Sequence, residues 1–212
     1  SPLGVALSLA RRHQILEWAD RSRAWIIEDD YDSEFRYHGK PLPALKSLDA
    51  PQRVIYAGTF SKALFPALRC AWLVLPVKQI AQFRHQASLA PCAVPVLWQN
   101  TLADFLREGH FWRHLKKMRQ HYAQRRQWIE QALTQQGFQV VPQKGGIQMV
   151  IRMIGDDIAH ARKANAAGLA VQALSDWRIR SSGEGGLLLS FTNIVNEGMA
   201  RQVAQQLRKA LS

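Results

Sequence analysis

Cysteine and long apolar runs are scarce in this sequence, and each absence excludes a class of protein. The 212 residues include two cysteines, Cys70 and Cys92. Both lie in apolar stretches without CxxC or CxxH spacing, so we expect reduced core thiols of a cytoplasmic protein rather than a disulfide framework or a zinc site. No run of about 18 apolar residues occurs, so the sequence predicts no transmembrane helix and no membrane partner. The chain starts at Ser1 without a methionine, so we expect its natural N-terminus to be missing.

Negative charge is also scarce. The chain has 16 Asp and Glu against 28 Lys and Arg, for a net charge of +12. This balance makes nucleic acid or another polyanion a partner to consider. Much of the excess lies between Arg107 and Arg126, in a stretch with the apolar spacing of an amphipathic helix. A solvated helix face explains this stretch more simply than a nucleic-acid groove does, so we rank direct nucleic-acid binding by this chain last.

The first third of the chain alternates helix and strand signals. A helix is predicted within residues 7–23, with Ser8 as its N-cap. Short apolar strands are predicted at residues 24–27, 53–58 and 70–76. Such strands, joined by longer connections, indicate an α/β sheet that is covered on both faces. Ligands bind these sheets beyond the carboxyl ends of the strands. A cluster of carboxylates follows the first predicted strand at that end, and "GTFSK" follows the second.

The second half begins with a helical region over about residues 96–135, for which Gly137 is the expected stop. A small α+β unit follows. Its predicted elements are strand 138–142, a turn at Gly145 and Gly146, strand 147–153, helix 156–176, strand 178–181, strand 187–194 and helix 197–211. We therefore expect two domains, residues 1–95 and residues 96–212.

The stretch "IIEDDYDSEFRY", residues 26–37, places five carboxylates in the seven positions from Glu28 to Glu34. A calcium loop that started at Asp30 would need Gly and Glu where the chain has Phe35 and Pro41, so we predict no metal site. A hydrolase with paired carboxylates stays open, although the sequence does not locate the partner groups. Pairing with the basic surface accounts for most of these acids.

Lys62 stands in the second motif, "AGTFSKALFPALR", residues 57–69. The GxxxxGK[ST] frame is absent, so Lys62 is not a lysine of a phosphate-binding P-loop. Lysine at such a place is usually a surface residue, because lysine is seldom buried. Apolar surroundings, however, lower the pKa of a lysine amine. A larger fraction of the amine is then neutral, which makes it a possible Schiff-base nucleophile.

The two motifs together supply the groups that pyridoxal 5'-phosphate requires. The lysine binds the cofactor as an imine, a carboxylate keeps the pyridine nitrogen protonated, and an arginine neutralises the phosphate. With these residues in this order, the chain resembles the aminotransferase-like domain of the MocR/GabR family. Members of that family are transcriptional regulators that join a GntR-type winged helix-turn-helix to a fold-type-I aminotransferase domain.

The resemblance covers essentially the whole chain. It implies an α/β, fold-type-I PLP-dependent aminotransferase-like fold, with the second half of the large, mostly parallel sheet domain followed by the small C-terminal α+β domain. By this resemblance Lys62 is the internal-aldimine lysine, Asp29 the partner of the pyridine nitrogen, and Tyr31 the donor to the ring hydroxyl. The implied phosphate ligands are Thr59, Ser61 and Arg69. A DNA-binding domain and the first part of the cofactor site would lie upstream of Ser1, and the full-length protein would be a homodimer.

Two positions depart from the family pattern. Leu188, in "LLLSF", replaces the arginine of "LRLGF" that receives the carboxylate of an amino-acid ligand, and Ala71 stands at a common Gly position. A leucine cannot pair with a carboxylate, so another arginine serves or the ligand differs. Arg36 and Arg180 are the candidates for that role, although each is more simply explained as a surface residue.

Two functions use the same cofactor residues. The first is an effector sensor, which binds PLP and a small amine or amino acid and so changes how the missing domain binds DNA. The second is a working aminotransferase, in which Lys62 also moves the Cα proton. Leu188 favours the sensor, because a transaminase must orient an α-carboxylate.

Overall fold

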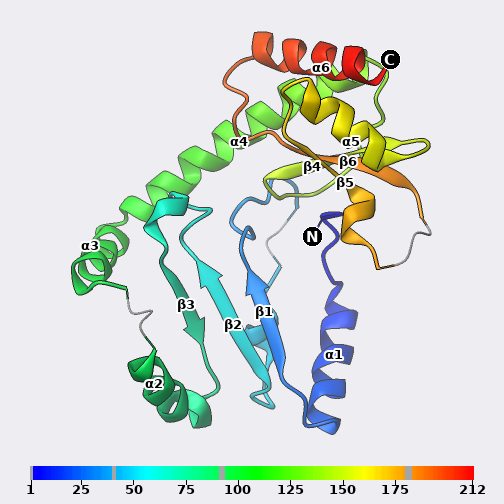
Figure 1. The fold of residues 1–212 in the computed structure, drawn as a ribbon. Coiled ribbons are helices and arrows are strands. Elements are labelled where there is room, and N and C mark those ends of the chain that lie inside the picture. The colour runs from blue at the N-terminus through cyan, green and yellow to red at the C-terminus, as the bar shows by residue number, and fades with distance from the viewer. Residues whose placement is uncertain (1, 40–41, 91–93, 180–182) are drawn as a thin grey trace. The chain divides into compact units, whose positions relative to one another are not determined.

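The structure, a computed structural model, describes residues 2–39, 42–90, 94–179 and 183–212 (Figure 1). Its contacts divide the chain into two units, which we describe separately. The N-terminal unit consists of Ala6–Glu34 and Lys40–Lys116, and the C-terminal unit of Ser1–Val5, Phe35–Gly39 and Lys117–Ser212. The assignment of residues 1–95 and 96–212 to two domains stays a prediction.

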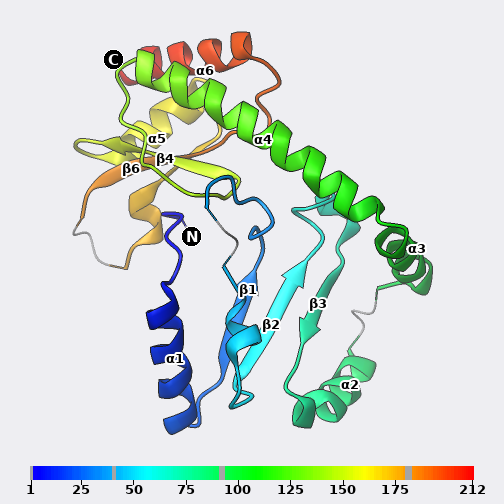
Figure 2. The same ribbon diagram turned by 180° about the vertical axis from the view of Figure 1, so that it is seen from behind.

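Three strands form the sheet of the N-terminal unit (Figure 2). β1 (Ile26–Asp30) pairs in parallel with β2 (Val54–Thr59), and β2 pairs antiparallel with β3 (Ala71–Val74). All three lie where apolar runs predict strands. The expectation that the carboxylates follow the first strand is wrong, because β1 continues through Glu28 and Asp30. The acids stay in the strand because the pairing with β2 continues to Gly58 and because both side chains find partners outside β1.

One helix covers the start of this sheet. α1 (Leu9–Arg21) begins after Ser8, whose hydroxyl accepts a hydrogen bond from the backbone N–H of Arg11 at 3.3 Å, so the predicted cap is confirmed. Leu16 of α1 is buried in a small core with Leu45 and Val54. The other helices that lie within the unit are η1 (Leu45–Leu48), η2 (Pro66–Leu68), η3 (Val77–Gln79), α2 (Ile80–Leu89) and α3 (Val96–Arg107).

A second core lies where β2 ends. Its buried members are Phe60, Ala63, Cys70, Leu102, Phe111 and Leu115. α3 and the first turns of α4 (His110–Gln135) supply the last three of these side chains. Cys70 is a free, buried thiol as the sequence predicts, and Cys92 lies outside the described residues.

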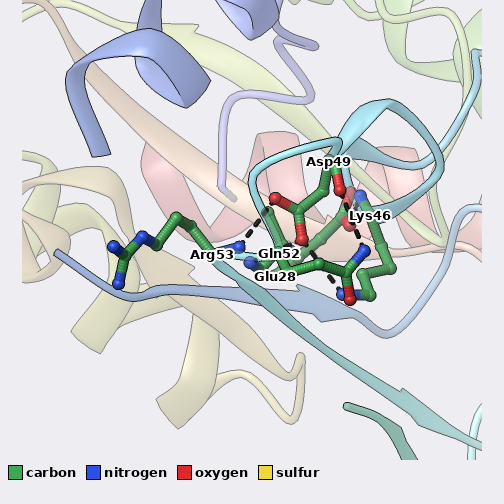
Figure 3. A network of polar contacts seen from close by, with 6 residues as sticks. Glu28, Lys46, Asp49, Gln52 and Arg53 are labelled. Carbon is green, nitrogen blue, oxygen red and sulfur yellow. Dashed lines mark hydrogen bonds and ion pairs between the residues drawn. The ribbon is translucent and has the colours of Figure 1, made fainter. Parts of the chain in front are cut away.

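Two carboxylates fasten the segment between β1 and β2 to the sheet (Figure 3). Glu28 accepts hydrogen bonds from the backbone N–H groups of Leu45, at 2.6 Å, and Lys46, at 2.9 Å, where η1 begins. Asp49, which is only 4% exposed, accepts from the N–H groups of Arg53 and Val54 at 2.7 and 2.8 Å, and its side chain lies 3.0 Å from the Lys46 ammonium. Acids therefore hold both the start of η1 and the start of β2.

The region predicted as one helix over residues 96–135 is two helices. α3 ends at Arg107, Gly109 takes a positive φ of 72°, and α4 begins at His110. Glycine adopts this left-handed backbone without steric cost. Gly137, with a φ of 81°, follows the end of α4 and confirms the predicted stop. None of the helices in the described part of the chain is both long and apolar enough to cross a membrane.

The C-terminal unit is built on a second, antiparallel sheet. β4 (Gln148–Met153) and β5 (Val171–Ala173) both pair with β6 (Gly185–Ser190), which lies between them. α5 (Asp157–Ala166), α6 (Glu197–Leu211) and the last turns of α4 bury their small and apolar side chains with this sheet in the largest core of the described chain. The helix predicted at residues 197–211 is confirmed.

Three predictions about the C-terminal unit are wrong. The strand expected at residues 138–142 is a single bridge, Val140 to Ile151. The helix expected to reach Asp176 ends at Ala166, because Gly168 turns the backbone with a φ of 86° and the Asn165 side chain bonds both backbone groups of Val171. The strand in this region is therefore β5 rather than residues 178–181, of which 180–181 lie outside the described residues.

Asp157 joins three elements of the C-terminal unit. Its carboxylate, 2% exposed, accepts hydrogen bonds from the N–H of Ser175 at 3.2 Å and the N–H of Gly186 at 2.8 Å. Burial by itself would raise the pKa of Asp157, but these donors and the Arg178 charge hold that pKa below its usual range. The charged form of Asp157 is thus the one that the fold stabilises.

Replacing Asp49 by Ala is expected to lower the free energy of unfolding by about 2–3 kcal/mol, because two backbone N–H groups and an ammonium lose their acceptor. Urea unfolding of the full-length protein measures this loss. Asp20→Ala is the control, since Asp20 is exposed and its ion-pair partner, the Arg53 Nε, is 3.8 Å away; we expect less than about 0.5 kcal/mol there. Equal losses would refute the role given to Asp49.

Asp157→Asn is expected to cost about 1–3 kcal/mol near neutral pH, since the amide N–H₂ would face N–H donors. The pKa of Asp157 is lower in the folded protein than in the unfolded chain, so its stabilisation is present above the unfolded pKa of about 3.9 and is lost as the pH falls through the folded pKa. The gap between wild type and variant should therefore shrink in acid. Asp176→Asn, at an exposed site, serves as the control; a gap that does not depend on pH would contradict the assignment.

Candidate active site

The predicted cofactor residues gather at one edge of the β1–β2–β3 sheet. They are Asp29, Tyr31, Thr59, Ser61, Lys62 and Arg69. β1 and β2 are parallel, with Asp29 opposite Ala57, so their carboxyl ends meet at this edge. β3 is antiparallel and starts there, with Ala71 opposite Thr59. Sheet topology alone therefore brings together two motifs that are distant in the sequence.

Asp29 is an open carboxylate in the acidic cluster. Successive residues of a strand point to opposite faces, so Asp29 points away from the face that carries Glu28 and Asp30. The side chain of Asp29 is exposed, and it has no hydrogen-bond or ion-pair partner among the described residues. An open carboxylate at a strand end can receive a protonated ring nitrogen.

Asp30 is fully engaged on the opposite face. Its carboxylate accepts hydrogen bonds from the Tyr56 hydroxyl at 2.8 Å, from the Ser33 hydroxyl at 2.7 Å and from the Ser33 N–H at 3.2 Å. Burial and the bond to Asp30 raise the pKa of the Tyr56 phenol well above its ordinary value, so Tyr56 remains a donor. Sequence reasoning missed Tyr56, because its bond joins β2 to a residue of β1 that lies 26 positions away in the chain.

The pKa of Asp32 is affected by the charge of Lys62. Burial raises the pKa of Asp32, the negative charge of Asp30 raises it further, and the positive charge of Lys62 acts in the opposite direction. The acidic loop after β1 and the lysine turn after β2 therefore influence each other across the site edge.

Lys62 sits on a tightly bonded turn. Phe60 and Ala63 are buried on either side of it, whereas Lys62 is exposed. The N–H of Ser61 donates to the Thr59 hydroxyl at 3.1 Å, and the N–H of Leu64 donates to the carbonyl of Phe60 at 2.8 Å. The apolar neighbours thus point into the core and do not surround the lysine as its sequence setting suggested, which leaves the amine accessible.

Trp72 packs directly against Gly58, which precedes this turn. A side chain at Gly58 would clash with the Trp72 indole, so only glycine fits there. The indole packs against the ring of Phe60, with 4.5 Å between ring centroids. Gly58 and Trp72 therefore fix the path of the chain as it leaves β2 for Lys62.

Arg69 leads into β3 in a strained conformation. Its φ of 50° lies in the left-handed region, which costs a non-glycine residue about 1 kcal/mol or more. Its side chain is exposed at the edge that holds Lys62. Ala71 has no positive φ, so the backbone does not require the glycine that related sequences often have there.

The two candidate carboxylate receptors, Arg36 and Arg180, stay predictions. Arg36 belongs to the C-terminal unit, where it bridges to Gly145 and its buried Nε lacks a hydrogen-bond partner. Arg180 lies outside the described residues. Leu188, on β6, is 2% exposed and packs with Val150 and Leu174. That position is therefore an apolar core position and not a carboxylate receptor.

The groups at the sheet edge fit a phosphorylated pyridine aldehyde. An accessible amine, an open carboxylate, two hydroxyls and a guanidinium match the aldehyde, the ring nitrogen and the phosphate respectively. No group of three or more His, Cys, Asp or Glu side chains suited to a metal ion occurs in the described ranges. The amine, carboxylate, hydroxyl and guanidinium groups at this edge suit an organic cofactor.

Comparison with known proteins identifies the family. The model of the aminotransferase class I and II family matches residues 1–183. Over 99% of its length the chain is 36% identical to the probable rhizopine catabolism regulatory protein MocR of Rhizobium meliloti, of which it covers 43%. It is 31% identical over its whole length to the pyridoxine biosynthesis transcriptional regulator PdxR of Corynebacterium glutamicum, of which it covers 46%. The chain thus spans less than half of these regulators.

A solved aminotransferase structure has the same fold as this chain. The Pyrococcus horikoshii kynurenine aminotransferase, determined in complex with PMP, matches 99% of this chain with a TM-score of 0.87 and 27% identity, and the match covers 53% of that enzyme. The fold-type-I aminotransferase-like fold predicted from the two motifs is confirmed, and so is the resemblance to MocR regulators. This chain belongs to the aminotransferase class I and II family, and its relatives include helix-turn-helix regulators of the MocR type.

Proposed function

We propose that this chain is the PLP-binding, effector-sensing part of a DNA-binding transcriptional regulator, with the cofactor attached to Lys62. The observation that supports this most is the placement of six suitable residues at or beside one edge of the sheet, with Lys62 and Asp29 both exposed. The similarity to MocR and PdxR supports the regulatory role.

Each residue at the edge has a defined task in this proposal. Lys62 supplies the amine that holds the cofactor covalently, and Asp29 holds the proton on the pyridine nitrogen. Tyr31, which is partly buried next to the end of β1, donates to the ring hydroxyl. The phosphate is bound by Thr59, Ser61 and Arg69. When bound, the protonated pyridine ring withdraws electrons from an attached amine.

The alternative is a working aminotransferase, which the similarity to kynurenine aminotransferase favours. Turnover requires that the α-carboxylate of the substrate be held so that the Cα–H bond is aligned. At the position where the family has an arginine, this chain buries Leu188. We therefore favour sensing over turnover, with a small amine or amino acid as the effector.

The partners of the whole protein follow from the same proposal. DNA would be bound by a helix-turn-helix domain outside this chain, as the names of the relatives indicate. The full-length protein would act in the cytoplasm as a homodimer.

Replacing Lys62 by Ala is expected to abolish covalent attachment of pyridoxal phosphate. Full-length protein is incubated with the cofactor and reduced with borohydride, and the labelled peptide is identified by mass spectrometry. Lys78→Ala is the control, because Lys78 is also exposed but lies in η3, away from the site edge. Label retained in the Lys62 variant would disprove the assignment.

The sensor proposal also predicts binding of ligand without turnover. Addition of a panel of amines and amino acids to the cofactor-loaded protein should change its absorbance spectrum for at least one compound, while keto-acid formation stays at the background of the Lys62→Ala variant. Sustained keto-acid production above that background would establish the aminotransferase instead.

A further inference from the structure

The turn that carries Lys62 is held by a side chain of α4. The Nε2 atom of His114 lies 2.7 Å from the carbonyl oxygen of Ala63, the residue directly after Lys62. A carbonyl can only accept a hydrogen bond, so Nε2 carries the proton. The two residues are 51 positions apart, and the contact is partly buried.

Apolar contacts reinforce this hydrogen bond. Phe111 and Leu115 lie on the same side of α4 as His114 and are 6% and 1% exposed. The ring of Phe111 meets the ring of Phe60 edge to face, with 5.6 Å between centroids. The first turns of α4 therefore contact both ends of the Phe60–Ala63 turn, through Phe111 at Phe60 and through His114 at Ala63.

Backbone hydrogen bonds hold the other end of the turn, where the N–H of Ser61 donates to the Thr59 hydroxyl at 3.1 Å. The N–H of Phe60 donates to the carbonyl of Cys70 at 3.0 Å. Cys70 and His114 thus fix the two sides of a turn whose middle residue, Lys62, is exposed and carries the reactive amine of the proposed function. Removing the His114 bond would leave the side after Lys62 held by the Leu64 N–H to Phe60 carbonyl bond within the turn and by apolar contacts to α4, which restrict orientation less than a directed bond does.

We propose that His114 is a positioning residue for Lys62: it fixes the peptide after the lysine and thereby the direction in which the amine points. This inference rests on the proposed function, in which Lys62 holds the cofactor. His114 does not itself touch the cofactor in this proposal, so its effect reaches the amine only through the turn.

Four variants of the full-length protein test the proposal. His114→Leu removes the donor and keeps an apolar side chain of similar size, and His114→Gln restores an N–H donor at about the place of Nε2. His114→Asn keeps the polarity but is too short to reach the carbonyl. His121→Leu is the matched control, because His121 lies on the same helix, is exposed, and bonds no other described residue.

Two readouts are used. The affinity for pyridoxal phosphate, followed by absorbance, should fall about five- to tenfold in His114→Leu and His114→Asn, as expected for the loss of one hydrogen bond. It should stay within about twofold of wild type in His114→Gln and His121→Leu. Hydrogen exchange of the Leu64 N–H, which needs no cofactor, should quicken in the first pair only. If His114→Leu does not fold, the comparison of Gln with Asn still decides.

The outcomes separate this inference from the proposed function. Wild-type affinity and exchange in His114→Leu, or equal impairment of Gln and Asn, would overturn the role of His114 while leaving Lys62 as the cofactor lysine. Wild-type protein that attaches no cofactor at Lys62 would instead overturn the proposed function, and the exchange measurement would still show whether His114 holds the turn.

Discussion

The parallel pairing of β1 with β2 is the constraint on which the site depends. It places Asp29 opposite Ala57 and ends both strands at the same edge, where the acidic loop and the lysine turn meet. A slip of one residue would turn Asp29 to the opposite face of the sheet. Glu28, bonded to the start of η1, and Asp49, bonded to the start of β2, hold this register through the segment that joins the two strands.

The acidic residues of β1 point to two different faces of the sheet. Glu28 and Asp30 face one side of the sheet, where each accepts hydrogen bonds that secure the surrounding chain. Asp29 faces the other side and stays open. Two of the five acids of the cluster are therefore explained as hydrogen-bond acceptors within the fold, and Asp29 is the one that we propose for the cofactor.

The turn that carries Lys62 also depends on packing against α4. Its first turns pack against the turn that carries Lys62, and its last turns are buried with the antiparallel sheet of the C-terminal unit. One continuous helix thus contributes to both units.

The sequence by itself determined the position of the three N-terminal strands, the helix ends at Ser8 and Gly137, and the six cofactor candidates, because each depends on local periodicity, capping chemistry or a contiguous motif. The extent of β1, the single bridge at Val140 and the strand β5 depend on pairing with distant residues, so no local pattern reveals them. The hydrogen bonds of Tyr56 and His114 are formed only in the tertiary structure. Each is a hydrogen bond to a residue 26 or 51 positions away, and only the folded chain brings donor and acceptor within 3 Å.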